Sequence, residues 1–145
     1  MSKIKTVVVS GGFDPIHVGH IRYFKEAKRL GEKLIVILNS DKFLEEKKGF
    51  VFMPFKERKE IIESIGYVNN VVSCFDKDDT VCNTLQSIRP DIFAKGGDRT
   101  IENIPERSVC EKNKIKMVFG VGGNKVQSSS WLTRRFKINL ERNAK

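Results

Sequence analysis

The stretch KTVVVSGGFDPIHVGH at residues 5–20 decides the fold of this chain. Residues 6–9 are β-branched and almost wholly apolar, which predicts a strand that is covered on both faces, as in a parallel sheet. Gly11 and Gly12 predict a tight turn in which the backbone approaches a ligand, because neither carries a Cβ. Apolar residues then recur every three positions as far as Leu30, and this spacing predicts a helix that begins near the first histidine.

A strand, a glycine turn and a helix N-terminus together favour an anion-binding site. The first N–H groups of a helix have no partner within it, and they carry the positive end of its dipole. His17 and His20 lie three residues apart in the first turn, so we expect both rings to project towards that site. Phosphate is the anion that we expect there. Two histidines at a helix start can also serve as a polar cap alone.

The segment Phe-Asp-Pro-x-His-x-Gly-His at residues 13–20 resembles the HxGH signature of the nucleotidyltransferase superfamily, which includes cytidylyltransferases and phosphopantetheine adenylyltransferase. The resemblance covers nearly the whole chain and implies a Rossmann-like domain. It also implies transfer of a nucleoside monophosphate to a phosphorylated acceptor, with release of pyrophosphate. His17 and His20 would be catalytic, and Lys48, or else Lys47, would reach the α-phosphate. Mg²⁺ is expected to accompany the nucleoside triphosphate.

Length and composition predict a single globular domain over residues 1–145. Hydrophobic residues make up 39% of the chain and charged residues 31%, and no apolar run approaches the length of a membrane span. The start passes within a few residues into a strand, which leaves no room for a signal peptide, so we expect a cytoplasmic protein. Three cysteines without a CxxC spacing argue against a disulfide framework and against a zinc site.

The formal net charge of +9 fits two classes of partner, nucleic acids and small anionic ligands. The aromatic residues lie in apolar runs and are not interleaved with arginines, so no base-stacking platform is evident. We therefore keep a basic nucleic-acid-binding module as the less favoured alternative. A nucleotide sensor without catalysis is a further alternative.

The remaining pattern alternates strands with helices and predicts a doubly wound, five-stranded parallel α/β sheet. Apolar runs predict the later strands, whereas apolar periods and cap residues predict the helices. The expected strands after the first are 33–41, which ends in polar residues, 68–75, 91–95 and 116–121. The later helices are 54–65, 79–88, 105–112 and one opened by Ser128 to Ser130. Residues 42–52 show no clean period and are expected to form a mobile, lysine-bearing connection.

Candidate ligand residues follow the carboxyl ends of the expected strands, which open into one crevice in a parallel sheet. By resemblance, the nucleotide-binding residues are Gly11, Gly12, Phe13, Arg58, Gly96, Gly97, Asp98, Ser128, Ser129 and Ser130. Asp14 and Asp41 are expected to place the acceptor or the metal.

Different segments of the chain resemble two different kinds of enzyme in this superfamily. Residues 56–72 resemble glycerol-3-phosphate cytidylyltransferases, whereas Lys-Gly-Gly-Asp at 95–98 resembles heptose-phosphate adenylyltransferases. We expect CTP and a small phosphorylated alcohol or sugar. The alternative is ATP with a sugar phosphate, pantetheine phosphate or FMN.

Two departures from the cytidylyltransferase pattern bear on this choice and on assembly. Gly123 replaces an arginine of the pattern, for which Lys125 is the expected substitute. Residues 66–70 lack three charges of the Arg-Tyr-Val-Asp-Glu element that relatives carry at a dimer interface, so a homodimer is expected less firmly than the fold.

Overall fold

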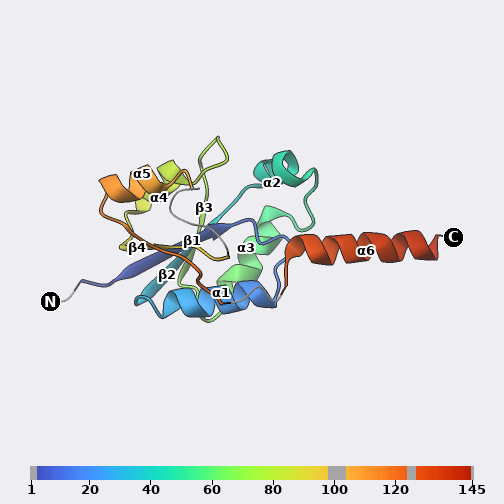
Figure 1. Cartoon of the computed structure of the whole chain (residues 1–145), viewed down its shortest axis with the longest axis horizontal. Coiled ribbons are helices and arrows are strands. Elements are labelled where there is room, and N and C mark those ends of the chain that lie inside the picture. Colours follow the sequence, from blue (N-terminus) through green and yellow to red (C-terminus); the bar gives the residue numbers. More distant parts are fainter. Residues whose placement is uncertain (1–2, 98–103, 124–126, 145) are drawn as a thin grey trace.

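The computed structural model describes residues 3–97, 104–123 and 127–144. Strands and helices alternate along the chain, as the sequence pattern predicts (Figure 1). The elements are β1 (Thr6–Gly11), α1 (Val18–Lys28), β2 (Lys33–Leu38), α2 (Asp41–Lys48), α3 (Phe55–Glu63), β3 (Asn70–Ser73), α4 (Cys82–Ile88), β4 (Ile92–Ala94), α5 (Arg107–Lys112), β5 (Lys116–Val118) and α6 (Ser129–Asn143).

The five strands form one sheet in the order β3-β2-β1-β4-β5, and every neighbouring pair is parallel. The prediction of a Rossmann-like, doubly wound sheet is confirmed. The chain builds outwards from β1 to β3 and then returns to place β4 on the other side of β1. Ligands of such sheets bind at this reversal, beyond the carboxyl ends of the strands.

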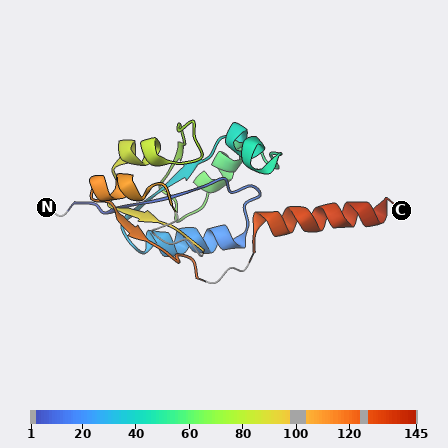
Figure 2. The same ribbon diagram turned by 45° about the horizontal axis from the view of Figure 1, so that its top comes forward.

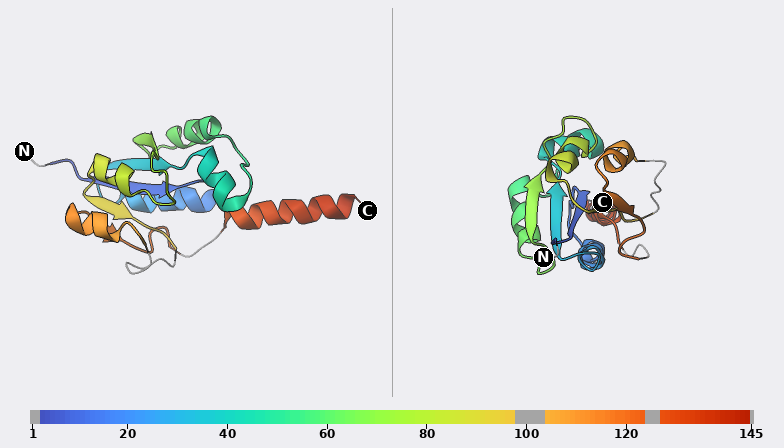
Figure 3. Two further views of the ribbon diagram at one scale, coloured as in Figure 1. Left: turned by 90° about the horizontal axis from the view of Figure 1, so that it is seen from above. Right: turned by 90° about the vertical axis from the view of Figure 1, so that its left-hand side faces the viewer.

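The alternation of side chains along β1 explains why both faces of the sheet are covered. Val7 and Val9 join a core with Phe24 of α1 and Ile62 of α3. Val8 points to the other face, where it packs with residues of α4 and α5. All three valines are completely buried, so the continuous apolar run marks a two-sided strand. Figures 1 and 3 show the helices lying on the two sides of the sheet.

The expected mobile connection at 42–52 was wrong, because Asp41–Lys48 forms helix α2. The Ser40 side chain caps its first turn by accepting from the Phe43 N–H over 3.1 Å. Gly49 ends it in the left-handed conformation at φ 89°, which glycine adopts without steric cost. Only Leu44 of this helix is buried, so the sequence carries almost no apolar period.

The helix that the sequence predicts over 79–88 begins later, at Cys82, and its N-cap residue makes no side-chain hydrogen bond to it. The Thr80 hydroxyl accepts from the Cys82 N–H over 3.3 Å. The Asp76 carboxylate accepts from the next two N–H groups, those of Asn83 and Thr84. Strands β2, β3 and β5 are shorter than the segments that predicted them.

Helix α6 differs from the others in that none of its side chains is buried. It runs away from the body of the domain and ends far from the N-terminus (Figures 1, 2 and 3). Only its N-terminal end therefore takes part in the packing around the sheet edge. Among the described helices, none is long and apolar enough to cross a bilayer.

Candidate active site

The two histidines form a reciprocal cap at the start of α1. His17 is the N-cap residue, and its Nδ1 accepts from the Gly19 N–H over 3.0 Å. The His20 Nδ1 accepts from the His17 N–H over 3.2 Å. The rings stack with centroids 3.7 Å apart and an interplanar angle of 26°. Because each Nδ1 is an acceptor, each neutral ring carries its proton on Nε2. The rings therefore cap the helix with one nitrogen and present a donor with the other.

Burial keeps the His20 ring neutral at physiological pH. Desolvation is the largest cause, and the positive charges of His17 and Lys48 add to it, so that the pKa of His20 falls to about 3. The edge of the Phe13 ring supports His20, with centroids 4.8 Å apart. A neutral imidazole of this tautomer is a hydrogen-bond donor that does not require protonation.

Glycines in this segment make room for side chains. A Cβ on Gly19 would lie 2.8 Å from the His17 Cε1. A Cβ on Gly11 would lie 2.9 Å from the Phe13 ring, and one on Gly12 would lie 2.6 Å from a Leu44 methyl group. Contacts this close do not occur between real side chains. Gly11 and Gly12 therefore also leave room for the Phe13 and Leu44 side chains, and the predicted approach of a ligand to this turn stays a prediction.

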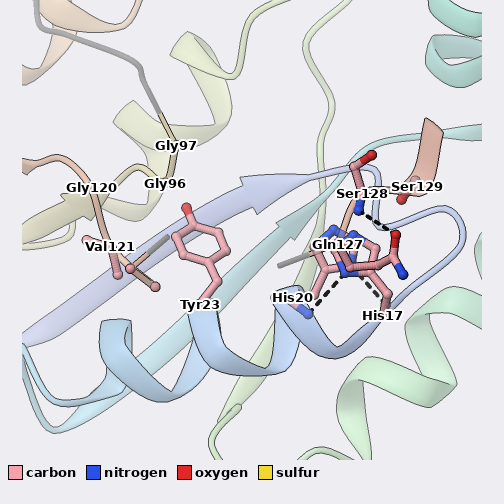
Figure 4. A pocket seen from close by; sticks show the side chains of 13 residues that line it. His17, His20, Tyr23, Gly96, Gly97, Gly120, Val121, Gln127, Ser128 and Ser129 are labelled. Carbon is pink, nitrogen blue, oxygen red and sulfur yellow. Dashed lines mark hydrogen bonds between the residues drawn. The ribbon is translucent and has the colours of Figure 1, made fainter. Parts of the chain in front are cut away.

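A cleft of about 630 Å³ brings together elements that are far apart in the sequence (Figure 4). The imidazoles of α1, the turn after β4 and the start of α6 all contribute to its lining. The lining residues named in the sequence prediction are His17, His20, Gly96, Gly97, Ser128 and Ser129. The predicted convergence of the histidines and the serine cluster at one edge of the sheet is present.

The three serines have different positions at the start of α6. Ser128 is the N-cap residue, and its hydroxyl accepts from the Trp131 N–H over 3.0 Å. The Ser129 hydroxyl donates to the Pro15 carbonyl over 2.7 Å. Ser130 is exposed and is not among the cleft-lining residues, so its assignment to the site stays a prediction. The backbone at the start of α6, more than the three hydroxyls, is what this end offers to an anion.

Lys48 lies on the other side of the segment that follows β1. Its Nζ donates to the Asp14 carbonyl over 2.8 Å. Burial is the main cause that lowers the pKa of Lys48, followed by the opposing effect of Asp14 and then by the charges of Lys47 and Arg58. Lys48 lines a second, smaller chamber, but its charge reaches His20.

Arg58 has a structural position that the sequence prediction missed. Its side chain is fully buried. The guanidinium donates to the carbonyls of Met53, Gly12 and Asn39 and to the Asp41 carboxylate, at 2.7 to 2.9 Å. With these donors engaged, Arg58 holds the ends of β1 and β2 against α3. The predicted phosphate contact of Arg58 stays a prediction beside this structural role.

The two aspartates expected to place acceptor or metal are engaged in the same way. Both Asp14 carboxylate oxygens accept backbone N–H groups, from Phe52 over 2.7 Å and from Met53 over 2.6 Å. Asp14 is completely buried. The Asp41 carboxylate accepts from Arg58 and from the Phe55 N–H. The Asp14 carboxylate and one oxygen of Asp41 therefore fix loops, and the assignment of both residues to acceptor or metal placement stays a prediction.

Two predicted residues, Asp98 and Lys125, lie outside the described residues. Gly123, which replaces the arginine of the cytidylyltransferase pattern, lines the cleft with a positive φ of 74°. No group of three or more histidine, cysteine, aspartate or glutamate side chains suited to a metal ion occurs within residues 3–97, 104–123 and 127–144.

Tyr23 is a cleft residue that the sequence analysis missed. Its hydroxyl donates to the Ala94 carbonyl at the end of β4. A Cβ on Gly122 would lie 3.1 Å from the Tyr23 Cα, so the glycine turn packs directly on α1. The sequence spacing could have identified this residue, because Tyr23 follows His20 by three positions and so shares its helical face.

A parallel sheet with an HxGH helix start and a serine-led helix at one edge defines the class of HxGH nucleotidyltransferases. The chain belongs to the cytidylyltransferase-like family of that class, because the family model of this description matches residues 8–135.

Similarity to individual proteins in sequence and in structure is consistent with this family. The chain is 39% identical over 124 residues to the bifunctional protein HldE of Syntrophotalea carbinolica, which covers 82% of this chain and 25% of that protein. It is 33% identical to the FAD synthase of Ferroglobus placidus over 78% of this chain and 72% of that one. A lipopolysaccharide core biosynthesis protein from Thermoplasma volcanium superposes with a TM-score of 0.69 at 25% identity, over 81% of this chain and 96% of that one. The chain thus spans about a quarter of the length of its HldE relative.

Proposed function

We propose that the chain transfers a nucleoside monophosphate from a nucleoside triphosphate to a phosphate oxygen of a small acceptor and releases pyrophosphate. The observation that supports this most is the meeting of two Nε2–H donors with the N-terminus of α6 in one cleft of about 630 Å³. A triphosphate has anionic groups for both ends of such a cleft.

The reaction is an in-line displacement at the α-phosphorus. An acceptor phosphate oxygen forms the new bond, the bond to the bridging oxygen of the β-phosphate breaks, and the electron pair leaves with pyrophosphate. The nucleophile is already an anion, so positioning and charge stabilisation are sufficient and no strong base is needed.

Different groups of the site would bind the triphosphate and stabilise the charge that develops in the reaction. His17 and His20 would donate from Nε2 to the α-phosphate oxygens and to the leaving bridge, where charge accumulates. The start of α6 would hold the terminal phosphates at the positive end of its dipole. Lys48, beside the Asp14 carbonyl, would neutralise charge from the opposite side of the loop.

CTP with a small phosphorylated alcohol or sugar is the first candidate pair of substrates. The FAD synthase relatives favour a specific second candidate, ATP with FMN, because FAD is FMN extended by AMP. The same ATP-dependent reaction extends to sugar phosphate or pantetheine phosphate as acceptor.

Mg²⁺ remains a prediction for the triphosphate complex. Asp14 has both carboxylate oxygens engaged, so the protein offers little to a bare ion at this loop. Mg²⁺ keeps several waters and commonly binds through substrate phosphates, which suits this donor set. A homodimer also remains a prediction, and light scattering of the purified chain tests it.

Pyrophosphate release is the measurement that tests the proposed function. CTP and ATP are each incubated with glycerol 3-phosphate, aldose phosphates, pantetheine phosphate and FMN. We expect release with at least one pair, and none above background for the folded His17→Ala/His20→Ala variant. Triphosphate binding without release would indicate a nucleotide sensor. Steeply salt-dependent RNA or DNA binding without release would indicate a nucleic-acid module.

A further inference from the structure

Tyr23 lies in the middle of the cleft, between the histidines and two glycine turns, residues 96–97 after β4 and residues 120–123 after β5 (Figure 4). It follows His20 by three residues, so its side chain projects from the same face of α1, one turn further along the helix. The reaction proposed above assigns it no role. Tyr23 is nevertheless the cleft residue through which the helix of the histidines meets the opposite wall.

The strand pair at the centre of the sheet is bonded over only part of its length. β1 pairs with β2 as far as Gly11 and Leu38, the last residues of both strands. Its pairing with β4 stops at Val8 and Phe93, so β1 does not pair with Ala94, the last residue of β4. Ligands of doubly wound sheets bind beyond the carboxyl ends of such a strand pair. The position of the β4 end relative to the histidines therefore depends on contacts other than the pairing with β1.

The Tyr23 hydroxyl supplies such a contact. It donates to the carbonyl of Ala94, a residue that is completely buried. Helix α1 is itself fixed against the sheet, because Phe24 and Ala27 are completely buried in the core with the valines of β1. The hydrogen bond therefore ties the end of β4 to the helix that begins with the histidines.

This bond acts on both glycine turns, because the segments that carry them are bonded to each other. The Lys95 N–H donates to the Val118 carbonyl over 2.7 Å, and the Val121 N–H donates to the Lys95 carbonyl over 3.1 Å. Lys95 follows Ala94 directly in the sequence. The wall opposite the histidines is thus held as one unit, and Tyr23 bonds to it at the end of β4.

The backbone of both turns also packs against Tyr23. A Cβ on Gly96 would lie 3.7 Å from a carbon of the Tyr23 ring, which is ordinary van der Waals contact. A Cβ on Gly122 would lie 3.1 Å from the Tyr23 Cα, which is closer than most real Cβ contacts. No side chain separates Tyr23 from either glycine, so a change at Tyr23 is transmitted directly to the turns.

We propose that Tyr23 is a positioning residue for nucleotidyl transfer, whose hydroxyl sets the position of the glycine turns relative to His17 and His20. This inference rests on the proposed function. With the phosphates held between the histidines and the start of α6, the nucleoside end of the triphosphate lies in the rest of the cleft, along the glycine turns. Tight binding of the whole nucleotide then requires a fixed distance between the two walls, whereas binding of the phosphates alone does not.

The test compares a nucleotide with a ligand that has no nucleoside. Calorimetry measures the Kd of the α,β-methylene analogues of ATP and CTP and of inorganic triphosphate, for the parent chain and for Tyr23→Phe. The variant keeps the ring and loses the hydrogen bond to Ala94. We expect the Kd of the tighter analogue to rise about tenfold and the Kd of inorganic triphosphate to stay within about twofold. A merely structural role would not separate the two ligands, because partial unfolding weakens both alike.

Two further proteins serve as controls. Tyr67→Phe makes the same change at the other tyrosine of the chain, which packs against the core and is not among the described residues that line the cleft. It should change neither Kd. Replacement of Tyr23 by para-aminophenylalanine returns an N–H donor to the same position, and it should restore the Kd of the analogue to within about threefold of the parent value.

The outcomes distinguish failure of this inference from failure of the proposed function. An unchanged analogue Kd in Tyr23→Phe, or an equal rise for both ligands, would overturn the inference even if the parent chain releases pyrophosphate. Selective loss of analogue binding in Tyr23→Phe would support it even if no pair of substrates releases pyrophosphate, and the proposed transfer would then fail alone. If the parent chain binds neither analogue, both fail.

Discussion

The Ser129 hydroxyl donates to the Pro15 carbonyl over 2.7 Å and joins residues that are 114 positions apart in the sequence. This bond fixes the first turn of α6 to the loop that carries the two histidines. Helix α6 has no buried side chain of its own, so this bond contributes to the position of its start. It links the helix start to the histidine loop, the two elements that we propose bind the triphosphate.

The first prediction concerns this bond. Ser129→Ala should lower kcat/KM by about tenfold, because the start of α6 loses a hydrogen bond worth about 1 kcal/mol to its position. The melting temperature should change little, since the bond is at the domain edge. Steady-state kinetics with calorimetric melting checks this. Ser130→Ala, at the exposed neighbour, is the control, and an equal loss in both variants would contradict the argument.

The second prediction separates the two nitrogens of His20. His20→Asn keeps an acceptor for the His17 N–H but removes the Nε2–H donor, whereas His20→Gln places an amide donor near Nε2. We expect the Asn variant to lose about a hundred- to thousandfold in kcat, as is typical when one donor to a developing charge is removed. The Gln variant should lose less. Single-turnover kinetics measures the difference, and equal losses would argue against a donor role for Nε2.

The third prediction is a dependence of stability on pH. The pKa of His20 is about 3 in the folded chain and near its ordinary value of 6.5 in the unfolded chain. Between these values the unfolded chain binds a proton that the folded chain does not. Stability from this residue is therefore complete above pH 6.5 and is lost as the pH falls towards 3.

Urea unfolding at a series of pH values measures this effect. The free energy of unfolding should fall between pH 7 and pH 4, and His20→Asn should show a shallower fall, because asparagine does not titrate. Parallel curves for the two proteins would show that other groups dominate.

The fourth prediction concerns Gly19. A Cβ at this position would lie 2.8 Å from the His17 ring, so Gly19→Ala must displace the imidazole. Activity should fall by about tenfold or more, as a small misplacement of catalytic groups does, while the melting temperature is maintained because alanine favours the helix. Gly66→Ala is the control, since a Cβ there meets nothing within 4 Å. Unchanged activity in Gly19→Ala would mean that the ring position is not critical.

The fifth prediction tests the structural assignment of Arg58. Arg58→Met should destabilise the domain by about 3–5 kcal/mol, because it leaves buried carbonyls of Gly12 and Asn39 without their donor. Lys59→Ala on the same helix, whose ion pair with Glu63 is exposed, should change stability by less than about 1 kcal/mol. Urea unfolding measures both. A stable Arg58→Met protein that binds triphosphate weakly would contradict this structural role and support the predicted phosphate contact.

The prediction of the fold succeeded where a signal was local and repeated. The run at Val7 to Val9 needs no partner to be recognised as a two-sided strand, and the glycine turn and histidine spacing identify the helix that follows. The prediction failed at α2, where only Leu44 is buried and the lysines hide the helical period. The helix predicted over 79–88 begins later than expected, at Cys82, where the Asp76 carboxylate accepts two N–H groups of the first turn.

The sequence by itself determined the alternation of strands and helices outside α2, and the family, because these depend on neighbours along the chain. Only the tertiary structure decided which polar side chains are hydrogen-bonded to other parts of the protein. Arg58 and Asp14 look like ligand residues in the sequence. In the folded chain both are hydrogen-bonded to backbone groups that folding brings close to them. Hydrogen bonds between distant segments, which no local pattern encodes, make that difference.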